Sequence, residues 1–292
     1  MTPSLRITVP GLLEKKSRGE KIVMLTAYDL PMARLLDEAG VDIILVGDSL
    51  GMVLLGYSST VPVTMEEMLH HTKAVRRGVS KGLLVGDMPF MSFNISVKET
   101  VRNAGRFMKE AGCDAVKVEG GQGSVASLQA VKAILSAGIP VLGHLGLTPQ
   151  TVAQLGGFKV QGRTSRSAVK LFESALELER AGCFGIVLEC IPAEVARLIT
   201  ENLRVPTLGI GAGPHCDGQV LVTHDLLGLT GFHAPRFVRR FARIDAQVSG
   251  AVKKFQQAVT RGGFPSDRES FRMEPSQWRR LKSALRAARR KR

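Results

Sequence analysis

The sequence has no run of apolar residues long enough to cross a membrane, which takes about 20 in succession. Its first residues, MTPSLRITVPGLLEKKSRGE, contain neither the apolar central region nor the small-residue cleavage site of a secretory signal. We therefore expect a protein without a membrane span and without a secretory leader.

Cysteine is scarce, and the four that occur, Cys113, Cys183, Cys190 and Cys216, form no CxxC pair. In a chain of this size, dispersed cysteines indicate reduced thiols and a cytoplasmic location. Cys190 directly follows Glu189 and could act as a nucleophile. Cysteine is also one of the residues most often buried, so we expect Cys190 to serve packing.

Acidic residues are outnumbered, with 26 Asp and Glu against 40 Lys and Arg, and the formal net charge is +14. The last 21 residues, RMEPSQWRRLKSALRAARRKR, hold nine Lys or Arg and one Glu, a net +8, which leaves +6 for residues 1–271. Such a mildly basic body suits an enzyme of anionic small molecules. We do not expect nucleic-acid binding from it.

The basic tail, residues 272–292, has its own pattern. Trp278, Leu281, Leu285 and Ala288 recur at helical spacing, with arginines on the opposite face. This spacing predicts an amphipathic helix that docks on the body or on a second subunit. A disordered tail and a helix that binds nucleic acid or an anionic surface are the alternatives.

Short apolar strands alternate with helical segments along residues 1–271, and each strand is a continuous apolar run, as in parallel sheets covered on both faces. The strands are predicted over residues 21–27, 41–47, 82–86, 114–118, 139–143, 184–188, 205–209 and 219–223. Helices are predicted over residues 64–77, 96–111, 123–137, 166–182 and 192–202. Eight such repeats predict a single-domain (β/α)8 TIM barrel followed by the tail. A doubly wound sheet is the alternative, but a GxGxxG motif is missing after the first strand.

Polar side chains follow or end five of these strands. In a barrel, the carboxyl ends of all strands meet on one face, which is where the active sites of such barrels lie. We therefore expect these side chains to face one another: Asp48, Asp87, Lys117 with Glu119, His144 and Glu189.

Clustered carboxylates repel one another unless a cation or protons neutralise them. A set of carboxylates without cysteine suits a hard ion such as Mg²⁺ better than zinc. For any single acid, an ion pair or a helix cap is an equally good explanation. For five strand ends together, a shared site explains more.

From about Ile7 to Phe271, the sequence resembles the ketopantoate hydroxymethyltransferase family. The resemblance is carried, in order, by TAYD, VGDSLGM, STVPVT, HHTKAVRRG, GDMPFMS, VKVEGG, GHLGLTPQ, GGFKVQGR, VLECIP and GIGAGPHCDGQVLVTHDLLG. It implies a (β/α)8 barrel, in agreement with the strand pattern. It also implies transfer of a one-carbon unit from 5,10-methylenetetrahydrofolate to 3-methyl-2-oxobutanoate, which gives ketopantoate for pantothenate and coenzyme A.

The resemblance implies a magnesium site formed by Asp48, Asp87 and Glu119, with Asp48 and Asp87 also contacting the oxoacid. It further implies a homo-oligomer, commonly a decamer. One position departs from the family pattern: Ser58, in GYSST, stands where an acid is expected. This leaves the structure of the first long loop open.

The remaining roles also come from the resemblance. It implies that the hydroxyl of Ser49 and the ammonium of Lys117 contact the oxoacid, that Glu189 is the general base, and that His144 lies in the pocket. The nearest rival is a magnesium-dependent barrel of the phosphoenolpyruvate mutase type, which would usually carry a cysteine-bearing catalytic loop. No such loop motif is present.

Overall fold

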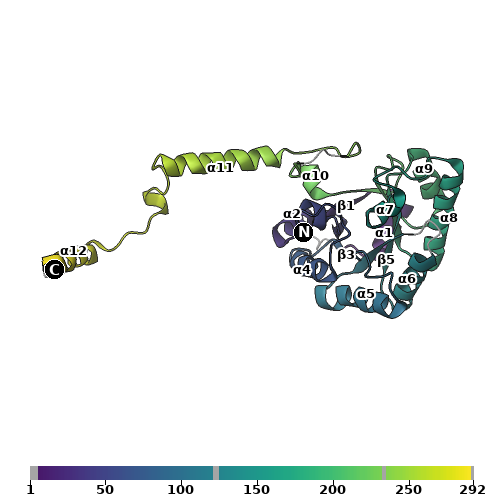
Figure 1. Ribbon diagram of the computed structural model, residues 1–292, viewed down its shortest axis with the longest axis horizontal. Helices are drawn as coiled ribbons and strands as arrows, with labels where there is room; N and C mark the ends of the chain where they lie inside the picture. The colour runs from purple at the N-terminus through teal and green to yellow at the C-terminus, as the bar shows by residue number, and fades with distance from the viewer. Residues whose placement is uncertain (1–5, 121–124, 232–234, 291–292) are drawn as a thin grey trace. The chain divides into compact units, whose positions relative to one another are not determined.

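The computed structural model describes residues 6–120, 125–231 and 235–290. The chain divides into two compact units, Met1–Ala242 and Arg243–Arg292. The first unit is a closed barrel of eight strands in the order β1 to β8 (Figure 1). The strands are β1 (Ile22–Thr26), β2 (Ile43–Val46), β3 (Leu83–Asp87), β4 (Ala115–Glu119), β5 (Val141–Gly146), β6 (Gly185–Glu189), β7 (Thr207–Ile210) and β8 (Gly218–Leu221).

Every neighbouring pair of strands is parallel, including the pair β1 and β8 that closes the barrel. The (β/α)8 barrel expected from the sequence is therefore confirmed. The fifth strand extends further than predicted: β5 continues to Gly146, so His144 lies inside the strand and not after it.

Helices surround the strands of the first unit (Figure 1). They are α1 (Val9–Ser17), α2 (Leu30–Glu38), α3 (Leu50–Val53), α4 (Met65–Arg76), α5 (Val97–Ala111), α6 (Val125–Ser136), α7 (Val152–Leu155), α8 (Ser165–Ala181), α9 (Ala193–Asn202) and α10 (Thr223–Leu227), with a 3₁₀ turn η1 (Pro149–Thr151). The five helices predicted from the sequence are α4, α5, α6, α8 and α9.

Local sequence explains where these helices begin and end. Thr64 and Glu67 form a capping box at the start of α4, and Ser96 accepts a hydrogen bond from the backbone of the first turn of α5. Gly112 ends α5 in the left-handed conformation, which costs glycine little. The chain therefore turns sharply from α5 into β4.

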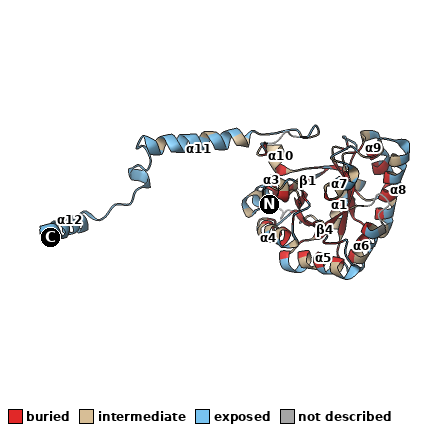
Figure 2. Ribbon diagram, viewed as in Figure 1, coloured by how far each residue is buried: buried red, intermediate tan, exposed pale blue. Residues whose placement is uncertain are grey.

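The core has two layers (Figure 2). Inside the barrel, side chains such as Met24, Leu45 and Leu142 form one cluster, to which α1 adds Leu12. A larger cluster lies between the strands and the outer helices. Because apolar side chains fill the inside of the barrel, polar side chains can gather only at the ends of the strands.

The second unit contains α11 (Ile244–Thr260), a 3₁₀ turn η2 (Asp267–Glu269) and α12 (Pro275–Arg290). The sequence-based boundary between residues 271 and 272 lies inside this unit. Helix α12 begins at Pro275, where a missing backbone N–H costs nothing. Lys291 and Arg292 lie outside the described residues. No helix in the described ranges has the length and apolar character needed to span a membrane.

Candidate active site

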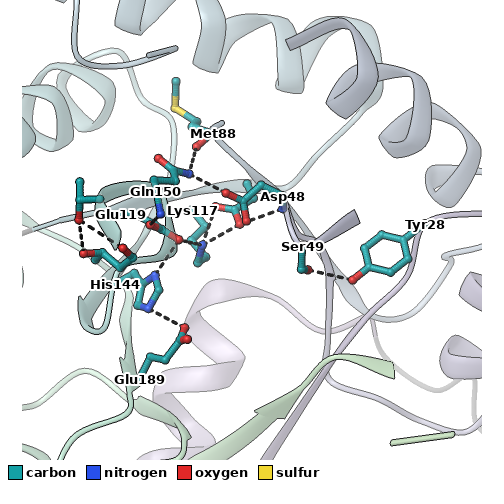
Figure 3. Close-up of polar contacts among 12 residues, drawn as sticks. Tyr28, Asp48, Ser49, Met88, Lys117, Glu119, His144, Gln150 and Glu189 are labelled. Atoms are coloured by element: carbon teal, nitrogen blue, oxygen red, sulfur yellow. Dashed lines mark hydrogen bonds and ion pairs between the residues drawn. The ribbon is translucent and has the colours of Figure 1, made fainter. Parts of the chain in front are cut away.

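The strand ends bring the predicted residues together on one face of the barrel (Figure 3). Strand register explains how: Asp87 on β3 pairs with Lys117 on β4, Glu119 on β4 pairs with His144 on β5, and Gly146 on β5 pairs with Glu189 on β6. Asp48 follows β2 directly. The sequence expectation that these side chains face one another is met.

Three carboxylates form the centre of the site. One oxygen from each of Asp48, Asp87 and Glu119 lies within 4.8 Å of the others, and all three residues are buried. Burial, followed by repulsion from Asp87 and Glu119, raises the pKa of Asp48 well above its usual range. Burial also raises the pKa of Asp87, although Lys117 opposes the shift. The cluster therefore carries more negative charge than its surroundings stabilise.

Lys117 is the cation nearest to this cluster. Its Nζ donates to both oxygens of Asp87, at 2.6 and 2.7 Å, and lies 3.5 Å from Oε1 of Glu119. Burial disfavours the ammonium, but Asp87 and Glu119 outweigh it and raise the pKa of Lys117. Lys117 is therefore a permanent cation that is paired with Asp87 and also lines the cavity.

His144 connects the carboxylate cluster to Glu189. Its Nδ1 lies 3.4 Å from Oε1 of Glu119, and its Nε2 lies 3.1 Å from Oε2 of Glu189. Neither contact has the alignment of a good hydrogen bond. Burial disfavours the charged ring, yet the two carboxylates prevail and raise the pKa of His144 to about 9. A protonated His144 keeps a positive charge beside Glu189.

Gln150, on η1, is a site residue that the sequence reasoning did not single out. Its Nε2 donates to Oδ2 of Asp48 at 3.0 Å and to the carbonyl of Met88 at 2.9 Å, and its backbone N–H donates to Oε2 of Glu119 at 3.1 Å. It closes the stretch GHLGLTPQ, which was noted only as a family block. Its position on the chain gave no sign of these contacts.

Ser49 is the residue that follows Asp48 in the chain. Its hydroxyl is 2.9 Å from the hydroxyl of Tyr28, which is buried near His224, with ring centroids 5.3 Å apart. Burial raises the pKa of Tyr28, so the phenol stays neutral and can donate or accept. Tyr28 therefore orients Ser49, a role that the TAYD stretch alone did not reveal.

The backbone around Glu189 is unusual. Cys190, the next residue, has φ +49°, a left-handed conformation that is uncommon for a residue with a side chain. Gly146 approaches so closely that an added Cβ would lie 2.1 Å from the carbonyl oxygen of Glu189. Burial raises the pKa of the Cys190 thiol to about 12, so this thiol is not ionised at neutral pH. Cys190 is half-buried and lines the cavity, so its expected packing role stays a prediction.

A cavity of about 810 Å³ opens above the cluster. Two long segments after strands line it: Met52, Tyr57 and Ser58 belong to residues 48–63, which follow β2, and Phe158 and Lys159 belong to residues 147–164, which follow β5. Tyr57 donates a hydrogen bond to Glu67. The departure at Ser58 thus falls on the cavity wall.

Comparisons with known proteins agree with this geometry. The family model described as Ketopantoate hydroxymethyltransferase matches residues 6–267. The chain is 56% identical over 266 residues to 3-methyl-2-oxobutanoate hydroxymethyltransferase of Syntrophomonas wolfei, covering 91% of this chain and 95% of that one. It is 56% identical over 272 residues to the protein of the same name from Moorella thermoacetica, covering 93% and 100%.

Similar folds occur among solved structures with low sequence identity. Phosphonopyruvate hydrolase in complex with oxalate and Mg²⁺ superposes with a TM-score of 0.57 at 13% identity, covering 96% of this chain and 97% of that one. 2,3-Dimethylmalate lyase gives a TM-score of 0.56 at 15% identity, covering 99% and 100%. At these identities the likeness concerns the fold alone.

Proposed function

The chain belongs to the ketopantoate hydroxymethyltransferase family, and from this premise we propose how its residues carry out the reaction. The enzyme transfers the one-carbon unit of 5,10-methylenetetrahydrofolate to 3-methyl-2-oxobutanoate and forms ketopantoate for pantothenate biosynthesis. One water is consumed, because the methylene group arrives on the oxoacid as a hydroxymethyl group and leaves tetrahydrofolate behind.

The donor set fits Mg²⁺. Asp48, Asp87 and Glu119 supply only oxygen atoms. Burial, followed by repulsion from neighbouring carboxylates, raises the pKa values of the two aspartates, and a bound cation would stabilise their charged forms. The amide oxygen Oε1 of Gln150 is also buried without a hydrogen-bond partner in the described part of the chain. We propose that these three carboxylates hold the ion. When bound, Mg²⁺ supplies positive charge that stabilises the oxygen of an enolate.

Two groups are placed to bind and orient the oxoacid. The ammonium of Lys117, held by Asp87, offers its charge to the oxoacid carboxylate or to the enolate oxygen. The Ser49 hydroxyl, oriented by Tyr28, offers a hydrogen bond from the other side of Asp48. Asp48 and Asp87 line the same wall of the cavity and complete the contact surface for the substrate.

Glu189 is proposed as the base that removes the C3 proton. It is partly exposed to the cavity, with 17% of its side chain accessible, while the other carboxylates are buried. Nε2 of His144 lies 3.1 Å from its Oε2 and helps to hold the carboxylate in position. One water breaks both C–N bonds of the methylene bridge, which gives tetrahydrofolate and the one-carbon unit at the level of formaldehyde. The C3 carbanion adds to this carbon, and the resulting alkoxide takes a proton from Glu189 to become the hydroxymethyl group.

The family also leads us to propose a homo-oligomer, commonly a decamer, in the cytoplasm. Native mass measured by light scattering tests the subunit number directly. A monomer at working concentrations would contradict it.

One observation carries the proposed mechanism: Glu189, a partly exposed carboxylate, lines the same cavity as the buried carboxylate cluster and is linked to that cluster through His144. The test is exchange of the C3 hydrogen of 3-methyl-2-oxobutanoate in D₂O, followed by proton NMR with and without Mg²⁺. Exchange should need Mg²⁺ but not folate, and addition of 5,10-methylenetetrahydrofolate should then yield ketopantoate. Ketopantoate formed at full rate after removal of all divalent metal would refute the metal site.

A further inference from the structure

The cavity is much larger than a small branched 2-oxoacid requires. At about 810 Å³, it lies in the range of roughly 300–1,000 Å³ that accommodates drug-sized ligands. The polar groups that would bind the oxoacid are confined to its floor, at the ends of β2 to β6. Most of the volume therefore lies outside the oxoacid site and is open to a second, larger molecule.

The walls of this outer volume are apolar and aromatic. Phe158 and Val160 line it with 60% and 49% of their surfaces exposed, which is high for apolar side chains beside a cavity. Phe237 also lines it, and its ring lies against Gly211, where an added Cβ would come within 2.9 Å of the ring. Aromatic side chains on the wall of a cavity suit a flat aromatic ligand.

Two cations accompany the aromatic residues. Lys159 and Arg236 line the same cavity, and among residues 6–120, 125–231 and 235–290 neither makes an ion pair with a carboxylate. Both are exposed. Unpaired cations on the wall of a cavity favour a ligand that carries carboxylates.

Both segments are connected to the position of the proposed base. The backbone N–H of Gln161 donates to the carbonyl of Cys190 at 2.9 Å, which ties the segment of Phe158 to the residue after Glu189. A Cβ added at Gly211 would lie against the Phe237 ring and 3.3 Å from Sγ of Cys190, so both side chains border this glycine. The aromatic part of the cavity therefore adjoins Glu189, beside which the attacking carbon of the oxoacid would form.

We infer that this outer part of the cavity is the reduced-folate site. The inference rests on the proposed function, which requires a folate co-substrate but does not locate it. The pterin and p-aminobenzoyl rings lie against Phe158 and Phe237, and the glutamate carboxylates contact Lys159 and Arg236. This placement brings the one-carbon unit next to Glu189 and leaves the acidic floor to the oxoacid.

Direct binding tests the aromatic part of the site. Tetrahydrofolate is titrated into the full-length protein with Mg²⁺ and the oxoacid present, by calorimetry under anaerobic conditions. Phe158→Ala should weaken binding by at least about 5-fold, as for loss of a stacked aromatic side chain. Phe241→Ala is the matched control, because Phe241 is 64% exposed but does not line the cavity. Equal affinity in Phe158→Ala and wild type would overturn the aromatic contact.

A folate analogue without the glutamate group tests the contacts proposed for Lys159 and Arg236. Wild type should bind tetrahydrofolate at least about 5-fold more tightly than tetrahydropteroate, which has no glutamate, and the preference should disappear in the Lys159→Ala/Arg236→Ala double variant. Lys170→Ala, on the exposed surface of α8, should retain it. A preference for tetrahydrofolate that survives in the Lys159→Ala/Arg236→Ala variant would overturn the assignment of the glutamate carboxylates to these two cations.

The outcomes separate this inference from the proposed function. Binding that depends on Phe158, Lys159 and Arg236 supports the folate site even where turnover fails. Turnover with wild-type folate affinity in all variants supports the proposed function and overturns the site. Wild-type protein that binds no tetrahydrofolate at all overturns the site by itself. Thermal melting of each variant, all of them at exposed positions, verifies that the fold is intact.

Discussion

At the scale of single residues, Asp48 is a buried carboxylate with a raised pKa at the centre of the cluster. A buried carboxylate whose folded pKa is raised destabilises the protein at any pH above its unfolded pKa, and stability is regained as the pH falls. Asp48→Asn removes this charge and can still accept the hydrogen bond from Gln150. We therefore expect a higher melting temperature for the metal-free variant at pH 7.

The same substitution should have the opposite effect once Mg²⁺ is added. A ligand that binds only the folded state raises the melting temperature, and the variant lacks one of three carboxylates for the ion. Melting curves with and without saturating Mg²⁺ measure both effects. Asp87→Asn serves as a contrast, because it leaves Lys117 without its bidentate partner and should destabilise even the metal-free protein. A lower melting temperature for metal-free Asp48→Asn would contradict the first expectation.

Glu189 can be examined apart from the metal. Glu189→Gln should lower the rate of C3 hydrogen exchange by about 10² to 10⁴, the usual contribution of a positioned general base, which corresponds to roughly 3 to 5 kcal/mol. The measurement is exchange in D₂O with Mg²⁺ and without folate. His144→Gln distinguishes the alternatives: if Glu189→Gln exchanges at the wild-type rate and His144→Gln does not, His144 is the base.

Single residues also show where sequence reasoning stops. The six polar groups at the strand ends were predictable, because the carboxyl ends of parallel strands converge on one face. Gln150 and Tyr28 were not, although both lie in stretches noted for their family resemblance. Gln150 lies on a 3₁₀ turn of three residues and reaches Asp48 across 102 positions of sequence. Its contacts depend on how the loop after β5 folds back over the site.

At the scale of elements, Asp37 links the end of α2 to the start of β3. It is buried and accepts hydrogen bonds from the backbone of Ser80, Lys81 and Gly82 and from the Ser80 hydroxyl. Burial disfavours its charged form, yet these donors together lower its pKa below 3.8. The strand that ends at Asp87 therefore begins from a turn held by one carboxylate.

Asp37→Asn should lower the free energy of unfolding by about 1–3 kcal/mol at pH 7, since buried donors lose a charged acceptor. A group with a lowered folded pKa stabilises above its unfolded pKa and loses this effect as the pH falls through the folded value. The difference between wild type and variant should therefore shrink below about pH 4. Urea unfolding from pH 3 to 7 measures it, with exposed Glu38→Gln as the control. A difference that does not change with pH would contradict this role.

The pattern of elements explains which parts of the fold could be predicted. All eight strands and the five longest helices of the barrel follow from continuous apolar runs and from helical periodicity. The short helices α3, α7 and α10, with four, four and five residues, span too few turns to show a period. The site is built where these short elements lie, so its loops were harder to predict than its strands.

At the scale of the whole molecule, the family model ends at residue 267, before α12 begins at Pro275. Chemistry that belongs to the family should therefore not need this helix. We predict that deletion of residues 272–292 leaves kcat within about 2-fold, whereas its effect on assembly depends on whether the stripe of Trp278, Leu281 and Leu285 docks on a neighbouring subunit. Turnover and native mass of the truncated protein measure both. Loss of turnover in a correctly assembled truncation would show that the barrel alone is insufficient.

The closed barrel also separates two kinds of evolutionary change. Every proposed chemical group comes from, or directly follows, the consecutive strands β2 to β6. The cavity wall from β7, β8 and β1 consists of Ile210, Val220, Met24 and Thr26, together with Val222 after β8. The cavity-lining residues of β7, β8 and β1 can therefore change without altering the chemical groups supplied by β2 to β6. A library randomised at Ile210, Val220 and Val222 should yield variants that accept 2-oxoacids with other side chains and still catalyse hydrogen exchange. If every altered variant loses exchange as well, the two halves are not independent, and new substrate ranges would have to arise by changing the chemistry itself.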